Sequence, residues 1–244
     1  MRFAARFSAL MLAPSLLACM PATEQTNPSV ELAGETLESW ATYDDAMKLT
    51  ELGVTLPMAL IEDMNETGGA LLPFPEMAQE QSGFSGLGLD YLLEGHGPQP
   101  YLMPHFDMHF YANDAQTREA IDCEAEPMPD AAKIPAAYMI PGTGVEPEGS
   151  CVPNMGIHAV NLESPELAME NPATFTETFI LGYHDGDMVF VEPMASQAFL
   201  REKTDWSFTL PVPEKMGENI KMYPTRFEGR FQADDTLTLT LYFE

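Results

Sequence analysis

Hydrophobic and polar side chains alternate along residues 103–111, which read M-P-H-F-D-M-H-F-Y. The odd positions from 105 to 109 carry His, Asp and His, whereas the even positions from 106 to 110 carry Phe, Met and Phe. Because successive side chains of a β-strand point to opposite faces, this pattern predicts a strand with one apolar face packed in a core. The other face carries three groups that can bind a metal or exchange protons.

Other stretches have the same β character. Residues 34–43, 86–93, 155–162 and 206–210 are rich in β-forming or apolar residues and are predicted to be strands. Two hairpins are expected, one from 175–183 and 188–193, the other from 223–232 and 236–243. The first has an Asp-Gly pair in its turn, which favours the positive φ angles of tight hairpins.

Helices are predicted only in short pieces. Residues 57–63, 75–81, 114–121 and 195–200 have helical character, and Pro57 fits a first helical turn. Residues 124–150 contain five prolines and are expected to be an irregular excursion. Many strands joined by tight turns predict a mainly β fold, an antiparallel β-barrel or sandwich with a few short helices, formed by residues 34–244 as a single domain.

The N-terminus resembles an export signal. Arg2 and Arg6 precede a mostly apolar run that is too short to span a bilayer. Leu16-Leu17-Ala18-Cys19 resembles the lipobox of bacterial lipoproteins, so residues 1–18 are predicted to be a lipoprotein signal peptide and Cys19 the lipidation site. The alternative is an ordinary signal cleaved near Ala22. Residues 19–33 lack apolar periodicity and are expected to form a flexible tether from an outer-membrane anchor to a domain in the periplasm.

Two cysteines remain after Cys19 is assigned to the anchor. An even remainder in an exported chain predicts a disulfide between Cys123 and Cys151. Such a bond would close a loop of about 27 residues and contribute roughly 3 kcal/mol in the chain-entropy model.

The charge of the chain excludes one class of partner. Its 244 residues include 38 acidic and 11 basic side chains, which gives a formal net charge of −27. Such a surface repels phosphate backbones, so nucleic-acid binding is excluded. The acidity itself identifies no site, and a homo-oligomer remains an open possibility.

Candidate metal ligands are His105, Asp107, His109, His158 and Glu192, with His96 as a possible addition. Alternate strand positions lie about 6.6 Å apart and positions four apart about 13 Å, so one ion cannot take both His105 and His109 without a bulge. The residue types suit Zn, Mn, Fe or Cu. If a coordination position stays open, Asp107 or Glu192 is the expected base of a small-molecule enzyme of cupin-like or hydrolase character.

The alternative for the same face is a hydrogen-bonded polar network, a solvated surface or an oligomer interface in a non-catalytic structural or envelope-stress protein. His184 lies in a predicted turn and is expected to be exposed, without a ligand role. Gly83-Phe84-Ser85-Gly86 lacks the frame of a nucleophile elbow, and no phosphate-binding glycine-rich loop is present. The 17 methionines are scattered, which favours core filling over copper binding.

Three segments resemble an uncharacterised exported bacterial family, a domain of unknown function with a representative from Thermus. They are P-H-F-D-M-H-F-Y, M-G-I-H-A-V-N and the run that ends in V-F-V-E-P-M. The resemblance extends over about residues 34–244 and implies that the six candidate residues named above occupy family motif positions. It implies no reaction.

Overall fold

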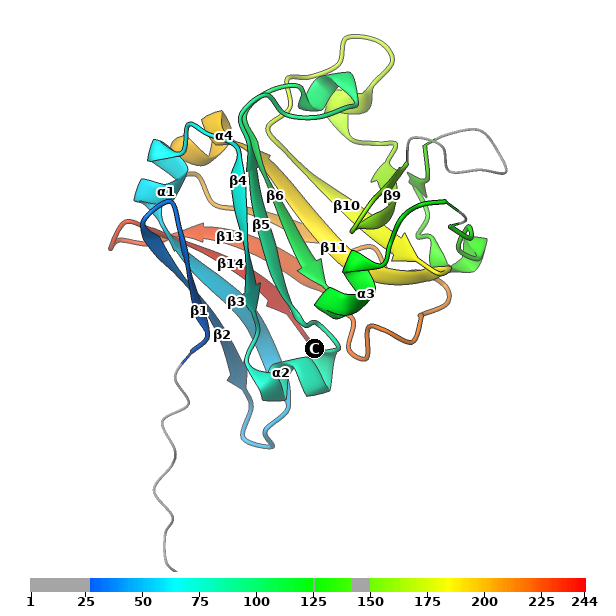
Figure 1. The fold of residues 1–244 in the computed structure, drawn as a ribbon, viewed down its shortest axis with the longest axis horizontal. Coiled ribbons are helices and arrows are strands. Elements are labelled where there is room, and N and C mark those ends of the chain that lie inside the picture. The colour runs from blue at the N-terminus through cyan, green and yellow to red at the C-terminus, as the bar shows by residue number, and fades with distance from the viewer. Residues whose placement is uncertain (1–26, 125, 142–149) are drawn as a thin grey trace, which may run out of the picture.

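Two antiparallel β-sheets form the architecture of the protein in a computed structural model that describes residues 27–124, 126–141 and 150–244 (Figure 1). The sheets pack face to face as a sandwich, so of the two predicted architectures the sandwich is confirmed. The predicted signal peptide and Cys19 lie outside the described residues and stay predictions. Within the described part of the chain, no helix combines the length and apolarity that a membrane span requires.

The first sheet has six strands and contains both ends of the described chain. Its order is β1 (Ser29–Leu32), β2 (Glu35–Tyr43), β3 (Leu49–Pro57), β14 (Thr236–Tyr242), β13 (Arg226–Phe231) and β12 (Trp206–Thr209). The C-terminal strand β14 is central, between β3 and β13. Strand β1 pairs with β2 from Ser29 to Leu32, so the last residues of the predicted tether belong to the sheet.

The second sheet carries the candidate site. Its order is β4 (Gly68–Pro73), β5 (Gly86–Leu92), β6 (His105–Tyr111), β11 (Asp187–Ser196), β10 (Glu177–His184), β9 (Gly156–Asn161) and β7 (Tyr138–Met139), with β8 (Cys151–Val152) also paired to β9. The predicted hairpin of β10 and β11 is confirmed, and its turn has positive φ angles at Asp185 and Gly186. Strand β6 therefore lies between β5 and β11.

The helices are short and lie at the ends of strands. They are α1 (Met58–Asp63), α2 (Glu76–Ser82), α3 (Ala115–Glu119) and α4 (Gln197–Arg201), with single 3₁₀ turns at Gln99–Tyr101, Ala131–Lys133 and Pro165–Leu167. Asp114 caps α3 by accepting a hydrogen bond from the backbone N–H of Thr117, as its sequence position predicts. The sequence analysis did not predict β3, although Leu52, Val54 and Leu56 alternate with Gly53 and Thr55 along it.

The main core lies between the two sheets. The even-numbered residues of β6 belong to it, and the ring of Phe110 packs on Phe227 of the first sheet with a centroid distance of 6.1 Å. In Figure 1, β13 and β14 of the first sheet run behind the strands of the second. The odd-numbered residues of β6 therefore face away from the first sheet.

That outer face of the second sheet is covered by a smaller apolar cluster. The cluster contains Tyr101, Val160, Phe175, Ile180 and Met194. Tyr101 lies in the segment before β6, and Phe175 lies in the segment before β10. Phe175 packs on His105, whereas Tyr111 and Phe190 pack on His109. As a result His105 is 0 %, Asp107 3 % and His109 1 % exposed.

The predicted disulfide between Cys123 and Cys151 is present. Cys151 is the first residue of β8, which pairs with β9. The bond therefore links the segment after α3 to β8, the neighbour of the strand β9 that carries His158.

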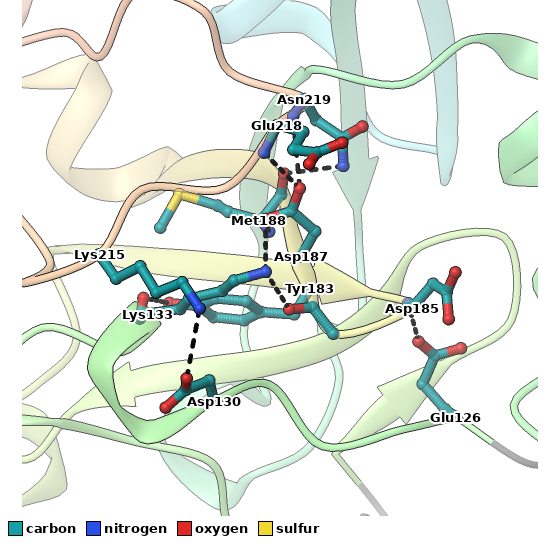
Figure 2. Close-up of polar contacts among 11 residues, drawn as sticks. Glu126, Asp130, Lys133, Tyr183, Asp185, Asp187, Met188, Lys215, Glu218 and Asn219 are labelled. Carbon is teal, nitrogen blue, oxygen red and sulfur yellow. Dashed lines mark hydrogen bonds and ion pairs between the residues drawn. The ribbon is translucent and has the colours of Figure 1, made fainter.

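A polar network around Asp187 fastens two distant segments to the β10–β11 turn (Figure 2). The Asp187 carboxylate accepts hydrogen bonds from Lys133 and from the backbone N–H groups of Glu218 and Asn219. Close by, Glu126 accepts from the backbone N–H of Asp185. One end of the central strands β10 and β11 is thus held by a half-buried carboxylate that accepts several hydrogen bonds.

Candidate metal centre

Six polar side chains converge on the outer face of the second sheet from four places in the chain. Strand β6 supplies His105, Asp107 and His109, β9 supplies His158, and β11 supplies Glu192. His96 comes from the segment between β5 and β6. These are the six residues that the sequence analysis singled out.

The six side chains form two groups of three. His96, His105 and Asp107 make up the first triad, and His109, His158 and Glu192 make up the second. Within each triad, one ligand atom from each residue lies within 4.8 Å of the others. His105 and His109 belong to different triads, as the strand spacing predicts.

The first triad is organised around Asp107. Its Oδ2 atom lies 3.2 Å from Nε2 of His96, and its Oδ1 atom lies 3.1 Å from Nε2 of His105. The His96 side chain is 40 % exposed, whereas that of His105 is fully buried. The first triad therefore extends from the interior to the surface.

The second triad is organised around Glu192 and lies deeper. Oε1 of Glu192 lies 3.3 Å from Nε2 of His109, and Oε2 lies 3.8 Å from Nε2 of His158. Both nitrogens of His109 and Oε2 of Glu192 are buried without a hydrogen-bond partner in the described structure. Burying such groups without partners costs about 1–3 kcal/mol each, so the arrangement implies a missing partner.

Backbone carbonyls orient three of the four imidazoles in the same way. The Nδ1 atom lies 2.7 Å from the carbonyl oxygen of Gly97 for His96, 2.7 Å from that of Met103 for His105, and 3.1 Å from that of Gly156 for His158. A carbonyl oxygen only accepts, so Nδ1 carries the proton at each of these residues. In the neutral ring, Nε2 then presents a lone pair to the carboxylate of its triad.

His109 has no such carbonyl partner among the described residues, but Asp90 on β5 lies near its Nδ1 atom, beyond hydrogen-bond distance. The Oδ2 atom of Asp90 lies 3.8 Å from Nδ1 of His109, and Asp90 pairs with Asp107 in the β5–β6 register. The sequence analysis missed this residue. The available signal was a single carboxylate in the apolar run G-L-G-L-D-Y-L-L, the same kind of signal that identified Glu192.

The electrostatics of the two triads differ. Burial lowers the pKa of His109 to about 3 and also lowers that of His158, so both rings are neutral at neutral pH. Burial, together with the charges of Asp107 and Asp90, raises the pKa of Glu192 well above its ordinary value. Without a metal, burial and the two neighbouring carboxylates therefore favour the protonated form of Glu192.

In the first triad, contacts between the side chains outweigh burial in determining the pKa values. Burial alone would raise the pKa of Asp107, but its contacts with His105 and His96 outweigh burial and lower it. The hydrogen bond from His96 to Asp107 raises the pKa of His96. The raised pKa of His96 and the lowered pKa of Asp107 therefore both favour an imidazolium–carboxylate pair when no metal is bound. Asp90 has a pKa raised to about 6 by burial and by the charge of Asp107.

One cavity connects the two triads. It has a volume of about 840 Å³, and its walls include His96, Asp107, His109, His158 and Glu192. Asp90 also lines it, whereas His105 lies behind the wall.

His184 takes no part in either triad. It lies in the β10–β11 turn, where its Nδ1 atom is 2.9 Å from Oε2 of Glu126 and its side chain is 25 % exposed. The expected exposure is therefore only partial, because Glu126 covers one side of the ring. Its position outside both triads agrees with the expectation that it is not a ligand.

Comparisons with known proteins give no relative for this chain. No protein-family model matches it, no curated protein matches it, and no solved structure matches it. The resemblance to an exported bacterial family therefore stays a prediction, and the class of the protein rests on its fold and its site. The described chain is a β-sandwich with buried His/Asp/Glu groups that can hold a metal ion.

Proposed function

We propose that this protein binds divalent transition metal ions, one in each triad. The observation that carries the proposal is the set of Nε2 lone pairs that point at carboxylate oxygens. At His105 the Nε2 atom and Oδ1 of Asp107 lie 3.1 Å apart, and neither has a hydrogen-bond partner. Two lone-pair atoms at this distance repel one another unless a proton or a metal ion lies between them.

The donor set fits transition metals. Each triad offers two imidazole nitrogens and one carboxylate oxygen, a combination used by catalytic zinc sites and by non-haem iron sites with open positions. Ligand atoms bound at about 2.0–2.1 Å in a tetrahedron lie roughly 3.3–3.4 Å apart. The nitrogen–oxygen distances across each triad range from 3.1 to 3.8 Å.

The partners of the Nδ1 atoms support the same function. In metal sites, a ligating histidine usually donates its other N–H to a carbonyl or a carboxylate, which fixes the tautomer and the direction of the ring. His96, His105 and His158 have carbonyl partners, and His109 has Asp90 close to Nδ1. A polar network without metal has no need for this uniform orientation.

Elemental analysis of the protein tests the proposal. The chain without its first 18 residues would be purified without a histidine tag and without exposure to chelator, and its Zn, Mn, Fe and Cu content measured. We expect two equivalents of transition metal per chain. Metal-free protein that is not stabilised against heat by any of the four ions would contradict the proposal and favour the polar network.

We also propose that the domain is exported and anchored through a lipid on Cys19. The disulfide between Cys123 and Cys151 supports export, because such bonds persist in oxidising compartments. The full-length chain, expressed in a bacterial host, is expected in the membrane fraction. Cys19→Ala is expected to move it out of that fraction, and an unchanged distribution would contradict the anchor.

A further inference from the structure

The cavity in front of the triads is larger than metal ions need. Its volume of about 840 Å³ lies in the range of small-molecule sites, which are mostly apolar with a few converging polar groups. It reaches the surface, since His96 and Val152 both line it and are about 40 % exposed. A molecule from solvent can therefore enter without passing through the core between the sheets.

The walls of the cavity are divided by polarity. Asp90 and five of the six triad residues, all but His105, form its polar side. Apolar residues form much of the remainder, among them Leu92, Tyr101, Val152, Met155, Val160 and Ile180. Three of them, Tyr101, Val160 and Ile180, also belong to the small apolar cluster that covers the outer face of the second sheet.

The net charge on the polar side of the cavity follows from the proposed metal ions. A divalent ion bound by two neutral imidazoles and one carboxylate keeps one positive charge. Two such ions leave two positive charges, and the Asp90 carboxylate removes one of them. A net positive charge in a mostly apolar cavity is strongly unfavourable unless an anion joins it.

We infer that the cavity binds a small organic acid, with the carboxylate at the metal-bearing side and an apolar body against the Val160 and Ile180 side. The inference rests on the proposed metal sites, because without metals the Asp107 and Asp90 carboxylates would make the same wall repel an anion. The inference assigns a class of ligand, small organic acids, that neither triad specifies by itself.

Isothermal titration of the zinc-loaded protein tests the inference with three probes. Octanoate carries both the anionic head and an apolar chain, acetate carries only the head, and octanol has an apolar chain of the same length without the charge. We expect octanoate to bind at least tenfold more tightly than either of the others. Equal affinity for octanoate and acetate would overturn the role of the apolar wall, and equal affinity for octanoate and octanol would overturn the role of the charge.

A pair of variants locates the binding. Val160→Phe narrows the apolar side of the cavity and is expected to weaken octanoate binding at least tenfold while leaving the zinc content at the wild-type level. Val212→Phe is the matched control, because Val212 is 66 % exposed and does not line the cavity. Unchanged octanoate affinity in Val160→Phe would place the acid elsewhere and overturn the inference.

Measuring zinc in every sample keeps the two proposals separate. Protein that holds zinc but does not bind octanoate would contradict the organic acid and leave the metal proposal intact. Protein that takes up no zinc would contradict both. Octanoate binding that persists at equal strength in zinc-free protein would show that the acid does not depend on the metals and would also overturn the inference.

Discussion

His105 and Asp107 lie two positions apart on β6, with Nε2 and Oδ1 separated by 3.1 Å and no hydrogen bond between them. The strand geometry places both side chains on the same face, and the carbonyl of Met103 holds the proton of His105 on Nδ1. The pair therefore presents one nitrogen lone pair and one carboxylate oxygen to a shared cation. His109 and Glu192 form a related pair across the neighbouring strands β6 and β11, with Nε2 and Oε1 separated by 3.3 Å.

Removing one ligand should empty one triad and spare the other. His105→Ala and His158→Ala are each expected to lower the metal content by one equivalent, because they belong to different triads. Elemental analysis and circular dichroism, which monitors folding, would be applied to each variant. Unchanged content in both would remove these residues as ligands.

His184→Ala is the matched control for the ligand variants. His184 contacts Glu126 and lies outside both triads, so its loss should leave the metal content unchanged. Asp107→Asn and Glu192→Gln provide variants that retain side-chain size. Each is expected to lose one equivalent without leaving a hole in the protein.

Asp90→Asn should weaken the second triad without changing its stoichiometry. Asp90 lies beside Nδ1 of His109 and positions the ring, and loss of such an outer contact typically reduces metal affinity 10–100-fold. Competition with a zinc chelator would measure the affinity. Asp114→Asn is a suitable control, since Asp114 caps α3 and does not line the cavity. Equal effects of the two variants would contradict the positioning role of Asp90.

Metal affinity should fall as the pH is lowered. The pKa of His96 is raised, chiefly by its hydrogen bond to Asp107, and the pKa of Glu192 is raised, chiefly by burial. Each metal must displace a proton from its triad, so affinity decreases about tenfold per pH unit for each proton released below the relevant pKa. Zinc titrations in two buffers of different ionisation enthalpy would count the protons. Binding that releases no proton between pH 6 and 8 would contradict this assignment.

Much of the site was predictable because β-strand geometry is simple. The alternation at positions 105 to 110 specified a strand, its two faces and the separation of His105 from His109. Residue type then identified His158 and Glu192, because imidazole and carboxylate groups in apolar strands need partners. These inferences require only local spacing.

The remaining features depend on long-range packing. The burial of His105 depends on Phe175 and Tyr101, which come from segments whose paths no periodicity specifies. The position of His96 in the first triad depends on the path of the segment between β5 and β6. The position of Asp90 near His109 depends on the register between β5 and β6. Sequence patterns could not separate a sandwich from a barrel, because both use the same antiparallel hairpins.

The network around Asp187 gives a test of stability that is independent of the metals. Burial would raise the pKa of Asp187, but its bonds to Glu218 N–H, Lys133 and Asn219 N–H outweigh burial and lower it below the ordinary value of 3.8. A lowered pKa in the folded state means that the carboxylate stabilises the fold fully above about pH 4, and that this contribution is lost as the pH falls through the folded-state pKa. Asp187→Asn should therefore reduce the free energy of unfolding at pH 7 by about 1.5–3 kcal/mol, the range for hydrogen bonds to charged groups. It should also flatten the loss of stability below pH 4.

Urea denaturation at pH 7 and at pH 3 would measure both effects. Asp185→Asn is the control, because this neighbour in the turn makes its contact to Glu126 through the backbone N–H. A similar loss at pH 7 in both variants would show that the turn, and not the Asp187 carboxylate, determines the stability of this end of the sheet.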